Sequence, residues 1–234
     1  WVRLFDETTT AMRFAFQGTD VTEAEILDAL SSTDAAKRKE AGHSLSATLK
    51  DHQRLLSLVM NTIAKDKQIE DGWRGFVRPV SSRNLANDVD DNVVDALVQA
   101  VNDRNVDLSH RYYSLKASWM GKKQIDWWDR NAPLPGDDDR HYEWGEAKQI
   151  VLDAFQGFDP EMAKIALPFF EQNWIDAAPR AGKSSGAFSH PVVPSAHPYI
   201  LMNFSGKSRD VMTLAHEMGH GIHQVLAADQ GYLM

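Results

Sequence analysis

The chain has 234 residues, 43% of them hydrophobic, and a formal net charge of -8 at pH 7. A chain of this length can bury a substantial core, either as one large domain or as two small ones. The acidic balance argues against a nucleic-acid-binding surface, which would require an excess of Lys and Arg. Because the chain has no cysteine, disulfides, thiol catalysis and thiolate metal ligands are excluded, and any metal must be held by His, Asp or Glu.

The apolar runs and the two ends of the chain bear on its location. Runs such as Ile165 to Phe170 are far shorter than the roughly 20 residues that cross a bilayer, so no membrane span is predicted. Trp1 stands at the start without an initiator Met, no signal-peptide pattern follows it, and the chain stops at Met234. We expect both ends to be cuts and predict a cytoplasmic protein, with the oligomeric state left open.

Helical periodicity recurs from the start of the chain to about residue 178, with short breaks. Thr22 and Glu25 have the spacing of a capping box, which predicts a short helix after Thr22. A longer helix is predicted next from apolar residues spaced mostly by three and four. These residues are Leu45, Leu49, Leu56, Val59 and Ile63. His52 fills a gap in this stripe, and we interpret it as a packed or edge residue rather than a ligand.

Four further helices are predicted before residue 178. Their ranges are 92–103, 108–120, 142–155 and 160–174. Asp159 is the expected N-cap of the last helix and Pro160 its first residue, while Pro168 is expected to kink or divide it. Residues 131–139 have the composition of an exposed loop, and the three aspartates that end it are predicted to be solvated.

The composition changes near residue 179, where Ser, Gly and Pro replace the helical pattern. Two short apolar runs, 186–189 and 199–204, are predicted to be strands with a proline-rich loop between them. A helix from about Ser208 to Ala227 follows. We therefore predict a mainly α fold, in which residues 1–178 form the helical part of one domain. Residues 179–234 are expected to add a small β element and the last helix to the same domain.

The last predicted helix carries the sequence His216-Glu217-Met218-Gly219-His220. Side chains four residues apart stand on one helix face, so the two imidazoles can bind one metal ion. Glu217 lies about 100° further around the helix, where its carboxylate can take a proton from water beside the metal. Nitrogen ligands suit zinc better than magnesium or calcium. We predict one Zn²⁺ ion held by His216 and His220, with Glu217 as the catalytic base.

A surface helix with incidental histidines would carry the same letters without metal chemistry, and His223 on the same stripe adds a second question. An ion between His216 and His220 would sit about half a turn short of His223. The elongated zincin pattern needs Gly at 223 and His at 226, where this chain has His223 and Leu226. We therefore expect His223 to pack or to support the site rather than to bind metal.

Three segments near the end of the chain resemble oligoendopeptidase F, which belongs to the wider group of thimet oligopeptidase and neurolysin. They are residues 174–183, 185–191 and 213–223, which read WIDAAPRAGK, SGAFSHP and TLAHEMGHGIH. The resemblance implies a largely helical, bowl-shaped zincin whose channel admits short peptides. It also implies that His216 and His220 are zinc ligands, that Glu217 is catalytic, and that a third ligand, a glutamate, follows beyond Met234.

The same resemblance implies a peptide-holding strand before the zinc helix. By position this role falls to Gly186, Ala187 and Phe188. Small residues there would let a peptide backbone approach closely.

Three functions are compatible with these patterns. The first is a zinc endopeptidase that hydrolyses internal bonds of short oligopeptides through metal-activated water, with Glu217 as general base. The second is a metallocarboxypeptidase of a related helical family, and the third is a helical scaffold that has lost activity. Since two histidines without a third ligand bind zinc weakly, we expect this chain alone to be inactive.

Overall fold

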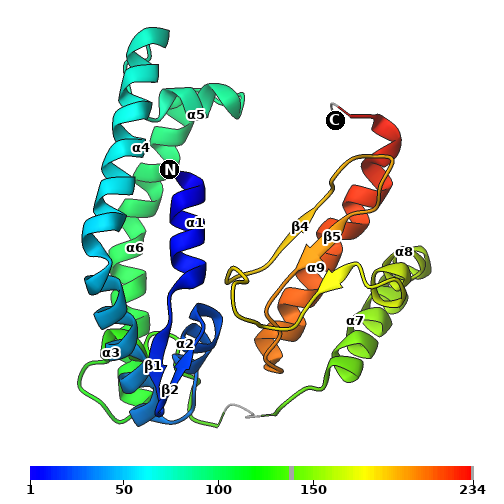
Figure 1. Ribbon diagram of the computed structural model, residues 1–234, viewed down its shortest axis with the longest axis horizontal. Helices are drawn as coiled ribbons and strands as arrows, with labels where there is room; N and C mark the ends of the chain where they lie inside the picture. The colour runs from blue at the N-terminus through cyan, green and yellow to red at the C-terminus, as the bar shows by residue number, and fades with distance from the viewer. Residues whose placement is uncertain (137–139, 233–234) are drawn as a thin grey trace. The chain divides into compact units, whose positions relative to one another are not determined.

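The computed structural model describes residues 1–136 and 140–232, and most of them lie in helices (Figure 1). The chain forms two compact units. Within the described residues, unit 1 comprises 1–8 and 29–136, and unit 2 comprises 9–28 and 140–232. No helix among the described residues is long and apolar enough to cross a membrane.

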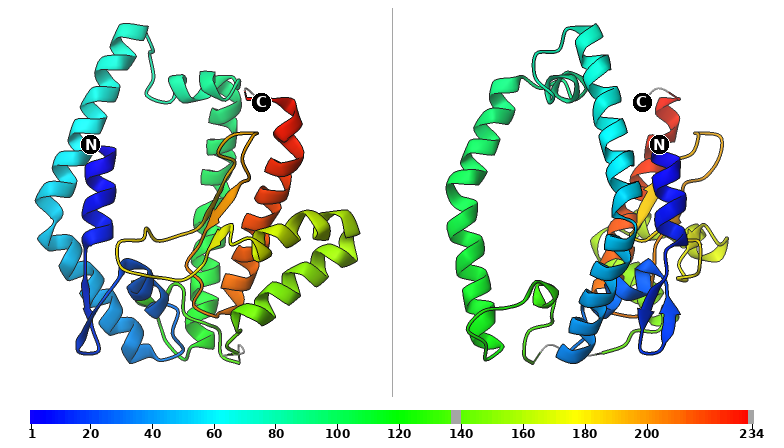
Figure 2. Two further views of the ribbon diagram at one scale, coloured as in Figure 1. Left: turned by 45° about the vertical axis from the view of Figure 1, so that its right-hand side comes forward. Right: turned by 60° about the vertical axis from the view of Figure 1, so that its left-hand side comes forward.

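Unit 1 is built from long helices. After α1 (Val2–Ala11), which crosses from unit 1 into unit 2, its elements are α3 (Ala35–Asp51), α4 (Gln53–Arg74), α5 (Ser81–Ala86), α6 (Asp91–Trp119) and the short 3₁₀ helix η1 (Trp127–Asp129). Figure 2 shows α5 bridging the end of α4 and the start of α6, while α4 and α6 stand apart along most of their lengths. Apolar side chains of both helices are exposed, among them Met60 of α4 and Leu97 of α6.

Two predicted helix boundaries in unit 1 were wrong. The stripe read as one helix around His52 is divided there, because His52 has non-helical backbone angles (φ −93°, ψ 0°) and ends α3 before α4 begins. His52 is the residue between α3 and α4, and its Nδ1 lies 2.8 Å from the Thr48 carbonyl in the last turn of α3. The helices predicted at 92–103 and 108–120 are one helix, α6, because the residues between them include no Gly or Pro to break it.

The base of unit 1 is held by a buried ionic network. Asp129 is fully buried, and its Oδ1 accepts hydrogen bonds from Arg38 Nε and Nη2 at 3.0 and 2.9 Å. Lys122 donates to the other carboxylate oxygen. Burial would raise the pKa of Asp129, but the hydrogen bonds from Lys122 and Arg38 outweigh it and lower that pKa. The network ties α3 to η1, which lies 91 residues further along the chain.

Unit 2 combines short strands with three longer helices. Its elements are β1 (Phe14–Phe16), β2 (Thr19–Val21), α2 (Glu23–Ala29), α7 (Trp144–Phe158), α8 (Pro160–Glu171), β3 (Ile175–Asp176), β4 (Phe188–His190), β5 (Tyr199–Leu201), α9 (Ser208–Ala227) and η2 (Ala228–Gln230). β1 and β2 form an antiparallel hairpin, and the second sheet has the order β3-β5-β4. In that sheet β3 is parallel to β5 and β4 is antiparallel to it.

The N-terminal part of unit 2 corrects one prediction and confirms another. Helical periodicity was expected here, but residues 14–21 form the β1–β2 hairpin, whose turn residues Gln17 and Gly18 have φ of 51° and 80°. The capping box is confirmed. The Glu25 carboxylate accepts from the Thr22 backbone N–H at 2.7 Å, and Thr22 Oγ1 accepts from the Glu25 N–H at 3.3 Å. α2 begins directly after it, at Glu23.

The helices α7 and α8 follow the sequence pattern with shifted ends. Asp159 is the N-cap of α8, where its Oδ1 accepts from the Glu161 backbone N–H at 2.9 Å, as predicted. Pro168 does not divide the helix, which runs through it and ends at Glu171 rather than at residue 174. Residues 131–136 are outside helices and strands, as expected of a loop, while the three aspartates 137–139 lie outside the described residues.

The core of unit 2 lies between α7, α8, α9 and β5. Its fully buried residues include Phe169 of α8, Ile200 of β5, and Leu214, Met218 and Ile222 of α9. The last helix has the predicted bounds. The predicted strand 186–189 overlaps β4 but is shifted, since β4 begins at Phe188 and ends at His190, and the predicted strand 199–204 corresponds to the shorter β5. This packing fixes α9 against the sheet and so positions every candidate residue described below.

Candidate functional site

α9 forms because its sequence supplies both a buried stripe and a stabilised start. Leu214, Met218 and Ile222 recur at helical spacing and are buried in the core. At the N-terminal end the Asp210 carboxylate accepts hydrogen bonds from the backbone N–H groups of Ser205 and Lys207, at 2.8 and 3.0 Å. A negative charge at this end also offsets the positive end of the helix dipole.

Two histidines stand together on the exposed face of α9. His216 and His220 are both exposed, and their Nε2 atoms lie 3.2 Å apart with the rings perpendicular. Two nitrogens that each bind one tetrahedral zinc at about 2.05 Å are separated by about 3.3 Å. The two rings therefore fit a shared zinc ion as two of its ligands, which agrees with the expected chemistry of the motif.

Glu217 lies between the two histidines in sequence but points to a different side of the helix. It is only 8% exposed, whereas both histidines face solvent. Within the part of the chain that the structure describes, its carboxylate makes no hydrogen bond or ion pair. An acidic group held in place by packing and left without a protein partner is free to exchange a proton with a bound reactant.

The resemblance implies a third metal ligand beyond Met234, so only the metal-binding capacity of the described residues can be assessed. Across 1–136 and 140–232, no group of three or more His, Asp or Glu side chains is placed to hold an ion. His223 is exposed on α9 and does not complete such a group. Within the described residues, His216 and His220 are the pair whose geometry fits two ligands of a zinc site.

The predicted peptide-holding residues lie at the edge of the second sheet. Gly186 and Ala187 precede β4, and Phe188 is its first residue. Gly186 has a φ of +86°, a backbone conformation that residues other than glycine rarely adopt. β4 pairs with β5 on one side, and within the described chain no strand pairs with its other side. An open strand edge of this kind can pair with an added peptide.

Two amide side chains that sequence reasoning missed hold β4 in place. Asn203 Nδ2 donates to the carbonyls of Ser184 and Gly186, both at 3.0 Å. Gln224 of α9 accepts from Ser189 Oγ at 2.8 Å and donates to the Ser189 carbonyl at 3.3 Å. Neither amide belongs to a motif, so only the pairing of the strands and the packing on α9 reveal them.

The loop before β4 is closed by a cluster of ions. Arg180 donates two hydrogen bonds to the Asp176 carboxylate, at 2.6 and 2.7 Å. The buried Lys183 donates to Asp176 Oδ1, to the Asp176 carbonyl and to the Ala178 carbonyl, at 2.9 to 3.0 Å. Hydrogen bonds from Arg180, opposed by burial and reinforced by Lys183, lower the pKa of Asp176 to about 2. These hydrogen bonds join both ends of the segment 176–183, which leads toward the edge strand.

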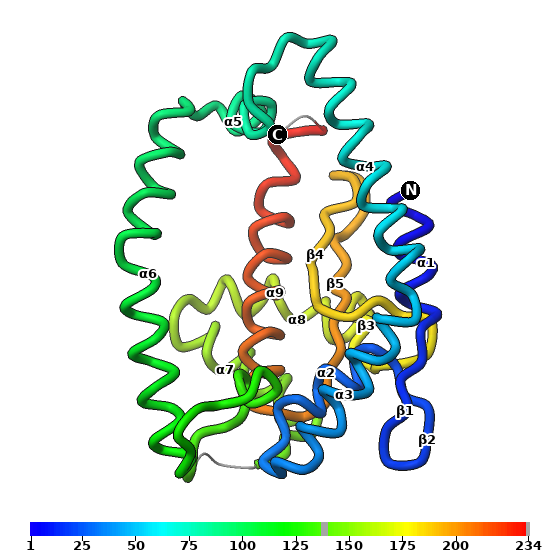
Figure 3. Tube along the Cα trace, turned by 90° about the vertical axis from the view of Figure 1, so that its left-hand side faces the viewer, coloured from blue at the N-terminus to red at the C-terminus, as the bar shows by residue number. Residues whose placement is uncertain are grey.

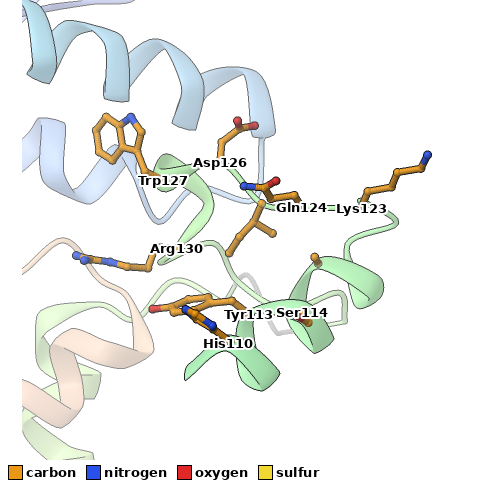
Figure 4. Close-up of a pocket in the computed structure, with 10 residues that line it drawn as sticks. His110, Tyr113, Ser114, Lys123, Gln124, Asp126, Trp127 and Arg130 are labelled. Carbon is orange, nitrogen blue, oxygen red and sulfur yellow. The ribbon is translucent and has the colours of Figure 1, made fainter. Parts of the chain in front are cut away.

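Unit 1 contains a separate cavity of about 460 Å³ between the C-terminal half of α6 and residues 123–130 (Figure 4). His110 and Tyr113 of α6 lie close together on one wall. The two cations that line the cavity, Lys123 and Arg130, point away from each other, so their charges do not converge on one ligand position. We assign no ligand to this cavity.

Comparison with known proteins places these features in a family. The model of peptidase family M3 matches residues 29–232. Oligopeptidase PepF of Bacillus subtilis is 27% identical over 207 residues, which cover 87% of this chain and 30% of that protein. An oligoendopeptidase F homolog of Borreliella burgdorferi is 28% identical, over 83% of this chain and 33% of its own length. The chain thus spans about a third of the length of these relatives.

Solved structures share the fold. A Bacillus anthracis protein assigned as an oligoendopeptidase F aligns with a TM-score of 0.87 at 17% identity, over 97% of this chain and 42% of that one. PZ peptidase A aligns with a TM-score of 0.83 at 19% identity, over 94% of this chain and 40% of that one. The mainly α fold class and the resemblance to oligoendopeptidase F are confirmed. Since the family model matches most of its length, the chain belongs to peptidase family M3.

Proposed function

We propose that this chain carries the metal-binding helix and the peptide-holding strand of a zinc-dependent endopeptidase that cleaves short oligopeptides. The observation that carries the proposal is the geometry of α9. His216 and His220 bring their Nε2 atoms to 3.2 Å on the exposed face, and Glu217, which directly follows His216, is buried on an adjoining side of the same helix. Membership of a peptidase family and relatives named as oligopeptidases support peptides as the substrate class.

The reaction assigns one task to each of these side chains. When bound, zinc supplies a Lewis acid that polarises a peptide carbonyl and acidifies water. His216 and His220 would hold the ion through the Nε2 atoms of neutral rings, and the remaining ring proton of each would then sit on Nδ1. A carboxylate oxygen of Glu217 accepts the proton of the attacking water and then delivers it to the nitrogen of the leaving amine. The water oxygen forms the new bond to the carbonyl carbon and the C–N bond breaks, so the products are a carboxylic acid and an amine.

The missing third ligand limits what the 234 residues can do alone. Two neutral imidazoles bind zinc more weakly than a site of three protein ligands. We propose that the third ligand comes from sequence outside this chain, as the resemblance implies for a later helix. Zinc retention by this chain and by a form extended to the length of the relatives should therefore differ, which metal analysis after dialysis measures.

The central test is Glu217→Gln in the extended form. The amide cannot accept a proton but keeps the size of the side chain and leaves both histidines in place. We expect zinc content to be unchanged and cleavage of an internally quenched, end-blocked peptide to fall about 100- to 10,000-fold. Turnover close to that of the unchanged protein would contradict the proposed role.

Matched controls separate the alternatives. His216→Ala should lose zinc together with activity, which distinguishes a ligand from a base. Use of an end-blocked peptide separates endopeptidase from carboxypeptidase activity, because a carboxypeptidase requires a free terminal carboxylate. Absence of both zinc binding and cleavage in the extended form would favour a helical scaffold without activity.

A further inference from the structure

The free edge of β4 exposes only some of its backbone groups, and the pairing of β5 determines which. The N–H groups of Ile200 and Met202 donate to the carbonyls of Trp174 and Asp176 on the β3 side. Since backbone groups alternate between the two sides of a strand, Tyr199 and Leu201 face β4. Their partners His190 and Phe188 therefore face β5, and Ser189 between them directs its N–H and carbonyl to the free edge.

Asn203 shows that this alternation continues before β4. The antiparallel register pairs Phe188 with Leu201. Gly186, two residues before Phe188, therefore lies opposite Asn203, two residues after Leu201. The Gly186 carbonyl does point that way, because it accepts from Asn203 Nδ2 at 3.0 Å. With Gly186 and Phe188 both turned toward β5, the N–H and carbonyl of Ala187 face the free edge. The open edge thus offers Ala187 and Ser189 to a peptide.

Gln224 occupies one of these edge groups. Its Nε2 donates to the Ser189 carbonyl at 3.3 Å, while its Oε1 accepts from the Ser189 hydroxyl at 2.8 Å. The next residue that would face the edge, Pro191, has no N–H. Beyond Ala187, the Ser189 N–H is therefore the last N–H donor that this edge offers to a peptide.

The Ser189 carbonyl lies beside a part of α9 that is nearer the C-terminal end of the helix than His216 to His220 are. Figures 1 and 3 show β4 running in the same direction as α9, with the loop after β4 near the C-terminal end of the helix. The Tyr232 hydroxyl, which follows α9, donates a hydrogen bond to Ser195 Oγ in that loop. Gln224 is seven residues after Glu217, which is about 10 Å along the helix. Ala187 is two residues before Ser189, about 7 Å back toward Glu217. Peptide pairing at Ala187 is thus closest to the proposed catalytic residues.

We propose that Gln224 is a positioning residue that sets the register of the bound peptide. By donating to the Ser189 carbonyl, Gln224 competes with a peptide N–H for that acceptor and favours backbone pairing at Ala187 and at the Ser189 N–H. This inference rests on the proposed function and adds to it the residue that selects which peptide bond reaches Glu217. Strand pairing repeats every two residues. A peptide that also paired with the Ser189 carbonyl would therefore be bound two residues out of the original register.

The test replaces Gln224 by Met in the extended form, which keeps the length of the side chain but removes the amide. We expect a second set of products, cut two residues away from the main site, when an end-blocked peptide is digested and the products are identified by mass spectrometry. The ratio of the two registers should change about 2- to 10-fold, the effect of one hydrogen bond. Identical products from both proteins would overturn the proposal.

Two further variants separate the hydrogen bond from simple packing. Ser189→Ala removes only the hydroxyl contact and leaves the Gln224 donor on the carbonyl, so it should give the original products. Gln224→Glu keeps an acceptor for the hydroxyl but has no donor, so it should resemble Gln224→Met. A Ser189→Ala protein with displaced products, or a Gln224→Glu protein without them, would contradict the assignment.

A binding measurement tests the same idea without cleavage. In a Glu217→Gln background, residue-resolved hydrogen exchange should show that an end-blocked peptide protects the amides of Ala187 and Ser189, which are unpaired in the free strand edge. Lack of protection at Ala187 would overturn the register assignment even where cleavage is normal. Conversely, protection together with an extended form that never cleaves would leave the register intact and refute the proposed function.

Discussion

The two units of this chain differ in how their helices are held. In unit 2, α9 buries six residues and packs against α7, α8 and the sheet. In unit 1, α4 buries only Val59 although it has 22 residues, and Trp73 at its end is 85% exposed. The best-held helix is the one that carries His216, Glu217 and His220. Packing is thus concentrated around the helix that carries the proposed site, while α3 and η1 of unit 1 are joined by the ionic network of Arg38, Lys122 and Asp129.

The sharpest test of this contrast removes the ring at the centre of unit 2. Phe169 is fully buried, and its ring lies so close to Gly221 that a Cβ there would be 2.8 Å away. Phe169→Ala should lower the free energy of unfolding by about 3 to 5 kcal/mol, because it leaves a cavity beneath α9. Urea unfolding measures the loss, and peptide-resolved hydrogen exchange should locate it in unit 2.

Leu58→Ala is the matched control in unit 1, since Leu58 is 52% exposed. Its effect should stay within about 0.5 kcal/mol. Equal losses from Phe169→Ala and Leu58→Ala would show that the two units do not differ in this way.

The second test breaks the ionic network of unit 1. Asp129→Ala leaves Arg38, whose side chain is 3% exposed, without its carboxylate partner. We expect a loss of about 3 kcal/mol, at the lower end for a broken buried pair because Lys122 is 33% exposed and can turn to solvent. Hydrogen exchange should increase in α3 and around η1. A loss below about 1 kcal/mol would mean that other contacts hold the base of unit 1.

The third test uses pH on the loop before β4. The pKa of Asp176 is lowered from 3.8 to about 2, so the stability it contributes is complete above pH 3.8 and disappears as the pH falls toward 2. Because the Asp176 side chain is 38% exposed and screened by solvent, this contribution is about 1 kcal/mol. Between pH 5 and about 2, the free energy of unfolding should fall less in the Asp176→Asn protein than in the unchanged protein. Identical pH profiles would exclude Asp176 as the source.

Local sequence signals predicted much of unit 2. α9 has its predicted bounds because an apolar stripe and the groups at its start act within the helix. The capping box at Thr22 and the N-cap at Asp159 were also readable, since each joins residues two or three apart. The β1–β2 hairpin was missed because its strands have only three residues each, too few for alternation to stand out against helical spacing.

The sequence by itself determined the chemistry of the site: two imidazoles and a carboxylate on adjacent faces of one helix, because helix geometry fixes the relation of residues one and four apart. Only the tertiary structure decided how β4 lies beside that helix. The edge groups of Ala187 and Ser189, the Asn203 amide and the Gln224 amide become related through contacts 17 to 35 residues apart. Such contacts depend on which strands pair and which face packs, and no local spacing encodes either.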